Sequence, residues 1–172
     1  MVRHLAVRFS IFLFIIGTFS GCQKPNENIF ENYAWMSEIR DDHPRLFFNT
    51  KSFKQIKYRA LNEEKELYAE MKSRVDEMSG QKIEFTDPLV PDGTQNADHM
   101  YGTRAAEAAF VYLVTEDEKY LELCREILST LVDYYTLRNE HDLNIQWYAF
   151  SRINALAAFD WIYNDLKEKE RM

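Results

Sequence analysis

The apolar residues of this chain recur mostly at three- and four-residue steps, which is the spacing of one helical face. The first such stretch follows the segment "HPRLFF", and Asn49 or Thr50 can cap its start. Its apolar positions are Phe53, Ile56, Ala60, Leu67, Tyr68, Met71, Val75 and Met78, broken only around Glu64. Lys and Glu fill the other face, and Gly80 ends the pattern. The spacing predicts an amphipathic helix on an outer surface.

A long loop with Pro88, Pro91 and Gly93 follows, and the next apolar stretches are of two kinds. "RAAEAAFVYLV", within roughly residues 100–114, is apolar on most sides and predicts a buried helix. Thr115 to Glu118 then form a predicted capping box that starts an amphipathic helix. The apolar stripe of that helix is Tyr120, Leu123, Cys124, Ile127, Leu128, Leu131 and Tyr135. After a loop near 139–142, "LNIQWYAFSRINALAAFDWIYNDL" is apolar nearly all round and predicts a second buried helix.

Amphipathic and buried helices therefore alternate, and the two buried helices start about 44 residues apart, a spacing suited to stacked helical hairpins. The pattern predicts an all-α fold: an incomplete (α/α) toroid with the buried helices inside and the amphipathic helices outside. A right-handed solenoid of helical pairs would give the same signal. Four helices cannot close a ring, so we expect residues 43–172 to be the N-terminal part of a longer toroid domain.

The first residues have the pattern of an export signal. Arg3, His4 and Arg8 precede an apolar run from Phe9 to Ile16, and "FSGC" follows. Small residues before a Cys resemble a bacterial lipobox, so residues 1–21 are predicted to be a lipoprotein signal peptide and Cys22 the lipidated residue. The alternative is a plain signal peptide. Residues 22–42 then form a tether. We expect an outer-membrane lipoprotein, attached through its lipid, or a periplasmic protein of a Gram-negative bacterium.

Charge and cysteine content exclude several classes. The formal net charge is −7, and removal of the leader with Arg3 and Arg8 takes it to −9. Such an acidic chain lacks the basic face that nucleic-acid binding needs. Of the two cysteines, Cys22 would carry lipid and Cys124 lies on an apolar stripe, where a small buried side chain is expected. No disulfide framework, zinc site, other metal site or cofactor is predicted.

Three segments in order resemble the heparinase II/III-type polysaccharide lyases. They are "HPRLFFNTKSFKQIKYRA", "AAEAAFVYLVTEDEKYLELCREIL" and "RINALAAFDWIYNDLKEKER", and the resemblance covers about Asp42 to Met172. It implies an N-terminal α/α toroid, a C-terminal β-sandwich, and cleavage of an anionic, uronic-acid-containing polysaccharide of alginate or heparin/heparan type by β-elimination. The family's carboxylate-neutralising and proton-transferring residues lie on later helices. No residue here matches them, so no catalytic residue is assigned.

Polar and aromatic residues at the starts of the two buried helices are the candidate sugar ligands, because inner-helix ends of a toroid face its cleft. They are Asn144, Gln146, Trp147 and Arg152 on the second helix and Tyr101 and Arg104 on the first, beside His99. A Trp ring can stack on a pyranose, and Gln or Arg can donate to hydroxyls or a carboxylate. Alternatively, Trp147 is a core residue and Arg152 pairs with an acid such as Asp160. His43 is expected to fix the entry turn.

Two rival functions remain open. An α/α-barrel glycoside hydrolase would need paired carboxylates that project into the cleft, and such acids are not evident at inner positions. A non-catalytic glycan-binding surface lipoprotein would need only the sugar-binding residues.

Overall fold

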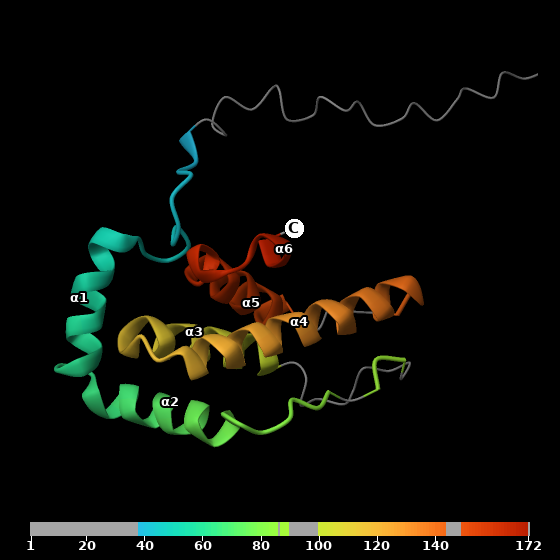
Figure 1. Ribbon diagram of the computed structural model, residues 1–172, viewed down its shortest axis with the longest axis horizontal. Helices are drawn as coiled ribbons and strands as arrows, with labels where there is room; N and C mark the ends of the chain where they lie inside the picture. Colours follow the sequence, from blue (N-terminus) through green and yellow to red (C-terminus); the bar gives the residue numbers. More distant parts are fainter. Residues whose placement is uncertain (1–37, 86, 90–99, 144–148, 172) are drawn as a thin grey trace, which may run out of the picture. The chain divides into compact units, whose positions relative to one another are not determined.

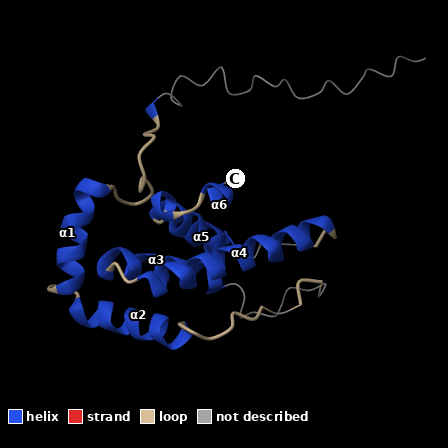
Figure 2. Ribbon diagram, in the orientation of Figure 1, coloured by secondary structure: helices blue, strands red, loops and turns tan. Residues whose placement is uncertain are grey.

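The computed structural model describes residues 38–85, 87–89, 100–143 and 149–171. Its elements are α1 (Thr50–Leu61), α2 (Lys65–Met78), α3 (Tyr101–Thr115), α4 (Glu118–Glu140), α5 (Ala149–Trp161), the 3-10 turn η5 (Tyr163–Asp165) and α6 (Glu168–Arg171) (Figure 1). These ranges contain helices and loops and no strand (Figure 2). The all-α prediction is confirmed. All seven elements belong to one compact unit, Arg40–Met172.

The first amphipathic stretch is two helices, α1 and α2, where the periodicity predicted one. The Asn49 side chain caps α1 by accepting from the backbone N–H groups of Lys51 and Ser52 at 2.9 and 3.0 Å. The chain then leaves helical geometry after Leu61, and the Asn62 amide donates to the Tyr58 carbonyl. The break is hidden in the sequence because the buried residues on either side of it stay in helical register.

The connection between α3 and α4 also differs from the sequence prediction. Thr115 is the last residue of α3, and its hydroxyl donates to the Val111 carbonyl at 2.7 Å, so it does not cap the next helix. Glu116 ends α3 in the left-handed conformation with φ 61°. Asp117 caps α4 by accepting from the backbone N–H of Lys119 at 3.1 Å. The predicted capping box at Thr115–Glu118 is therefore wrong.

The stripe of α4 packs as its periodicity predicts. Tyr120, Leu123, Cys124, Ile127 and Leu131 are buried. Cys124 is the expected small buried side chain, and burial raises the pKa of its thiol to about 12. A thiol in this state is a packing group rather than a nucleophile. No helix of the described residues is long and apolar enough to cross a bilayer.

Helices α3 and α5 pack in parallel, side by side. At their starts, the Gly102 backbone N–H donates to the Ser151 hydroxyl at 2.9 Å and the Asn154 amide donates to the Thr103 hydroxyl at 2.8 Å. At their ends, the rings of Phe110 and Trp161 lie 6.3 Å apart. Helix α4, which returns from the end of α3, packs along α3 as well. In a simple up-and-down bundle each helix would instead pack mainly on its antiparallel neighbours in sequence.

Helix α5 is buried on one side only, although its sequence predicted burial nearly all round. Ala157 and Ala158 are buried, whereas Phe150, Ile153 and Leu156 are 83%, 51% and 61% exposed. At 100° per residue, Ile153 and Leu156 lie on the side of α5 turned away from Ser151, and Phe150 lies at the edge of that side next to Ile153. No described element covers that side. We refer to Phe150, Ile153 and Leu156 as the bare face of α5.

The far end of α5 is fixed by Asp160, whose side chain is 5% exposed. Its carboxylate accepts from the backbone N–H groups of Arg45 and Leu46, each at 2.8 Å, and lies 2.6 Å from His43 Nδ1. The His43 ring also stacks on Tyr163 at 3.9 Å. The expected structural role of Asp160 and the expected role of His43 in the entry turn are both confirmed. Asp160 is thus held by residues 43–46, which we call the entry segment. The alternative ion pair between Arg152 and Asp160 is not formed.

A second polar contact joins α2 to α4. Asp76 accepts from Lys72 Nζ and from the Tyr120 hydroxyl, each at 2.6 Å, and from Lys119 Nζ at 3.2 Å. Lys72, followed by Tyr120, lowers the pKa of Asp76 from 3.8 to about 2. The carboxylate is 38% exposed, so water screens part of this interaction.

Substitution Gly102→Ala tests the α3–α5 contact. A Cβ at this position would overlap the carbonyl group of Ser151, so the two helices must separate. We expect a loss of about 3 kcal/mol in the free energy of unfolding, measured by urea titration, even though Ala is the better helix former. Gly80→Ala is the control: its Cβ meets nothing within 4 Å, and its φ of 81° should cost only about 1 kcal/mol. Equal losses in the two variants would contradict the close contact.

Asp76→Asn tests the contact between α2 and α4 through its pH dependence. Folding lowers the pKa of Asp76, so the unfolded chain binds the proton more tightly. The contribution of Asp76 is therefore complete above about pH 4 and is lost as the pH falls toward about 2. We expect Asp76→Asn to be less stable than the parent chain at pH 6 and to show a shallower loss of stability between pH 4 and 2. Glu63→Gln, at an exposed ion pair, should keep the parent slope.

Candidate functional site

The parallel packing of α3 and α5 brings the starts of both helices to one end of the helical layer. Helix α4 runs back along α3, so its C-terminal turns arrive at this same end. The loop residues 81–85 and 87–89, called the loop segment below, reach it too: Phe85 stacks on Tyr101 with ring centroids 4.2 Å apart, and the Pro88 carbonyl accepts from Arg138. We call this region the rim. It consists of Phe85, Tyr101, Arg104, Tyr134, Tyr135, Arg138, Ser151 and Arg152.

Aromatic rings in mutual contact form the framework of the rim. Phe85 meets Tyr134 edge to face at 5.6 Å, as well as stacking on Tyr101. Tyr134 in turn meets Tyr135 at 5.6 Å. The Tyr101 hydroxyl donates to the Glu84 carbonyl at 3.2 Å, which fixes the loop segment against α3. Rings positioned by their neighbours in this way can offer a preorganised surface to a sugar ring.

Two arginines lie on these rings. The Arg138 guanidinium is 5.8 Å from the Tyr134 ring centroid and donates to the Pro88 carbonyl at 2.8 Å. Arg138 is only 1% exposed, so it holds the loop segment and α4 together from inside. Arg152, on α5, is half-buried, and its guanidinium lies 6.0 Å from the Tyr135 ring centroid. Its position at the first turn of α5 makes it the rim cation better suited to a ligand carboxylate.

Arg104 forms an ion pair with Glu107, which in turn pairs with Arg74 of α2. Its Nη1 donates to Glu107 Oε2 at 2.6 Å, and Arg74 of α2 donates to the other oxygen of the same carboxylate at 2.7 Å. Beside this ion pair a cavity of about 250 Å³ is lined by Met78, Met100, Tyr101 and Arg104. Tyr101 and Arg104 are thus next to open space, as candidate ligands must be, but the charge of Arg104 is already shared with Glu107.

The sequence candidates fall into two groups. Tyr101, Arg104 and Arg152 are described. The ring contacts of Phe85, Tyr134 and Tyr135 connect Tyr101 to Arg152. Arg104 lines the same cavity as Tyr101. Asn144, Gln146 and Trp147 lie outside the described residues, as do His99 and the predicted lipidation site Cys22.

Sequence reasoning missed the contribution of α4 and of the loop segment. Tyr135 was assigned to the core stripe of α4, and Phe85, Tyr134 and Arg138 were not singled out. The available signal was the length of α4: a helix of 23 residues that runs back along a helix of 15 residues must reach the start of that helix and extend past it. That inference needs the packing partner of α4, which the periodicity alone does not give.

Metal chemistry has no support from the described residues, where no group of three or more His, Cys, Asp or Glu side chains could hold an ion. What the rim offers is aromatic surface, hydroxyl groups and guanidinium groups. This combination can bind a polyhydroxylated ring that carries a carboxylate. Comparison of the chain with known protein families, with curated proteins and with solved structures gives no match.

Proposed function

We propose that this chain is the N-terminal part of an exported polysaccharide lyase of heparinase II/III type, which cleaves uronic-acid-containing glycans by β-elimination. The observation that carries the proposal is the parallel contact of α3 and α5 with α4 packed along α3. Successive inner helices of an α/α toroid run parallel in this way, and each is joined to the next by an outer helix. The bare face of α5 supports the same reading, since a further inner helix would cover Phe150, Ile153 and Leu156.

The rim supports a uronate-containing substrate. In β-elimination the proton on C5 is removed and the bond from C4 to the glycosidic oxygen breaks, so the C5 carboxylate must be neutralised to stabilise the developing negative charge. Arg152 beside Tyr135 provides a cation next to an aromatic face. Arg152 is proposed as a substrate-binding residue, together with Tyr101, Arg104, Asn144, Gln146 and Trp147. The proton-transferring groups are not assigned to any residue of this chain.

The carboxylates of α3 and α5 disfavour the rival glycoside hydrolase. A hydrolase needs two carboxyl groups about 5–10 Å apart that are free to act as acid and as nucleophile or base. Glu107 is the sole carboxylate of α3 and Asp160 that of α5. Glu107 is held by two arginines and Asp160 by the entry segment. A glycan-binding lipoprotein without catalysis remains compatible with the rim, and turnover distinguishes it from a lyase.

Substitution Arg152→Ala tests substrate binding at the rim. We expect an alginate oligosaccharide to bind the variant about tenfold more weakly in calorimetric titration, because loss of a charge-assisted hydrogen bond removes about 1.5 kcal/mol of binding free energy. Lys51→Ala, which removes an exposed cation of α1, is the matched control and should bind like the parent chain. A neutral oligosaccharide such as maltohexaose should bind neither to the parent chain nor to the variants. Undiminished alginate binding by Arg152→Ala would refute the assignment.

The proposed membrane anchor has a separate test. If Cys22 carries lipid, palmitate should label the parent protein, and Cys22→Ala should abolish the label. Blocking lipoprotein processing with globomycin should leave a larger precursor in the membrane. Because such an anchor carries more than one acyl chain, washing with salt should not release the protein. Recovery of unlabelled parent protein in the soluble periplasmic fraction would contradict lipidation at Cys22 and would support an ordinary signal peptide.

A further inference from the structure

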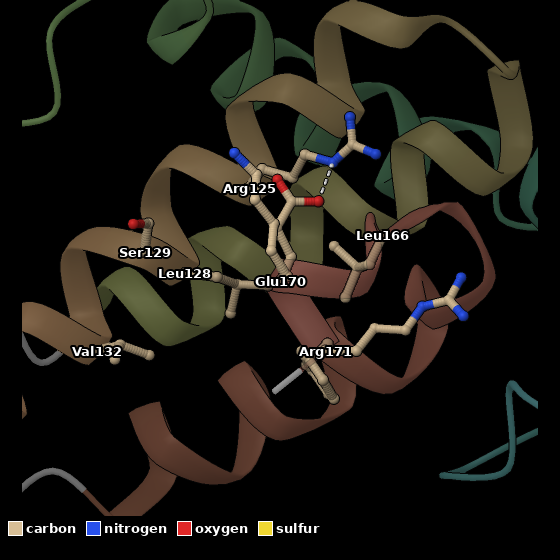
Figure 3. A pocket seen from close by; sticks show the side chains of 9 residues that line it. Arg125, Leu128, Ser129, Val132, Leu166, Glu170 and Arg171 are labelled. Carbon is tan, nitrogen blue, oxygen red and sulfur yellow. Dashed lines mark ion pairs between the residues drawn. The ribbon is translucent and has the colours of Figure 1, made fainter.

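A larger pocket lies away from the rim, toward the opposite end of α5. It has a volume of about 480 Å³ and is formed by α4, by Phe159 of α5 and by the segment 166–171 (Figure 3). This volume is within the range of roughly 300–1,000 Å³ that is typical of small-molecule sites. None of its lining residues belongs to the rim, so it is a separate feature of the molecule.

The pocket has an apolar part. Leu128 and Val132 contribute to it from α4, Phe159 from α5, and Leu166 from the turn after η5. Val132 is 64% exposed, so part of this apolar surface is in contact with water. An apolar ligand group placed against these four side chains would remove part of this surface from water, which is favourable.

The polar part of the pocket has an excess of positive charge. Arg125, Lys169 and Arg171 line it together with one carboxylate, Glu170. Arg171 is engaged elsewhere, because it donates to the Asn164 carbonyl at 3.1 Å and lies over the Tyr163 ring. Lys169 is exposed and makes no ion pair with any residue in the described part of the chain.

The guanidinium group of Arg125 has an N–H group without a hydrogen-bond partner. Its Nη2 donates to the Asp165 carbonyl, but its Nε is buried and has no hydrogen-bond partner. The carboxylate of Glu170 is the group facing it, at 3.7 Å, which is too long for a hydrogen bond (Figure 3). Glu170 Oε2 instead accepts from the Lys167 backbone N–H at 2.7 Å, and this bond is the main cause of the lowered pKa of Glu170. The guanidinium group therefore has capacity for a second acceptor.

We propose that this pocket binds a small amphiphile that carries one carboxylate, such as a medium-chain fatty acid. The ligand carboxylate lies between Arg125 and Lys169, in competition with Glu170, and the hydrocarbon part lies on Leu128, Val132, Phe159 and Leu166. A uronic acid fits this pocket poorly, because the apolar side chains that line it offer no hydrogen-bond partner to its hydroxyl groups. The inference does not depend on the proposed function, since it uses no rim residue.

Titration of the purified chain with decanoate, kept below its micelle concentration, tests the proposal. Val132→Asp places a carboxylate at an exposed position, so the fold should be retained while decanoate affinity falls at least tenfold. Lys169→Glu should have a similar effect. Glu170→Gln removes the competing negative charge and can still accept from Lys167, so it should increase the affinity. An uncharged amphiphile of the same length, decanol, should bind at least tenfold more weakly than decanoate.

The bare face of α5 is the competing apolar surface, and Ile153→Asp controls for it. Binding at the pocket leaves the affinity of Ile153→Asp unchanged, whereas adsorption to the bare face lowers it. Circular dichroism spectra of all variants should match that of the parent. The proposal is overturned if decanoate does not bind, if Val132→Asp binds it as tightly as the parent, or if only Ile153→Asp loses binding.

Discussion

The close approach of the α3 and α5 backbones at Gly102 and Ser151 is the constraint on which the rest of the structure depends. Gly102 leaves room for the Ser151 carbonyl, and the Ser151 hydroxyl satisfies a backbone N–H in the first turn of α3 that has no partner within its own helix. One residue pair therefore sets both the separation and the register of the two helices. This register places the starts of both helices together at the rim.

The other end of α5 is held by a buried charge rather than by small residues. An ionised carboxylate removed from water is stable only with several hydrogen-bond partners, and Asp160 finds them in a segment more than 110 residues earlier in the chain. The entry segment thereby becomes part of the α5 layer. With Ser151 fixed at one end and Asp160 at the other, the orientation of α5 is determined, and its bare face is presented as a continuous apolar strip.

The sequence could predict the helices, but not how they end or what lies beside them. Periodicity gave the buried stripes of α2 and α4, yet it passed through the break after Leu61, because Ala60, Tyr68 and Val75 remain on one face. Asn49 was a usable cap signal, whereas Thr115 was misleading, since a Thr hydroxyl can equally bond back into its own helix. The rim residues of α3 and α5 were within reach of the sequence. Those of α4 required its packing partner, and the pocket at Arg125 required the tertiary fold.

An arginine lies near each end of α5, and the side chains around it determine which kind of ligand can bind there. In the two sites proposed above, an arginine would meet the ligand carboxylate: Arg152 at the rim and Arg125 at the pocket. The surface beside the arginine differs. At the rim it is tyrosine rings with hydroxyl groups, which tolerate a hydroxylated ring. At the pocket it is three aliphatic side chains and the phenyl ring of Phe159, none of which can form a hydrogen bond to a hydroxyl group. In both proposed sites, specificity would therefore depend on the desolvation of the part of the ligand that carries no charge.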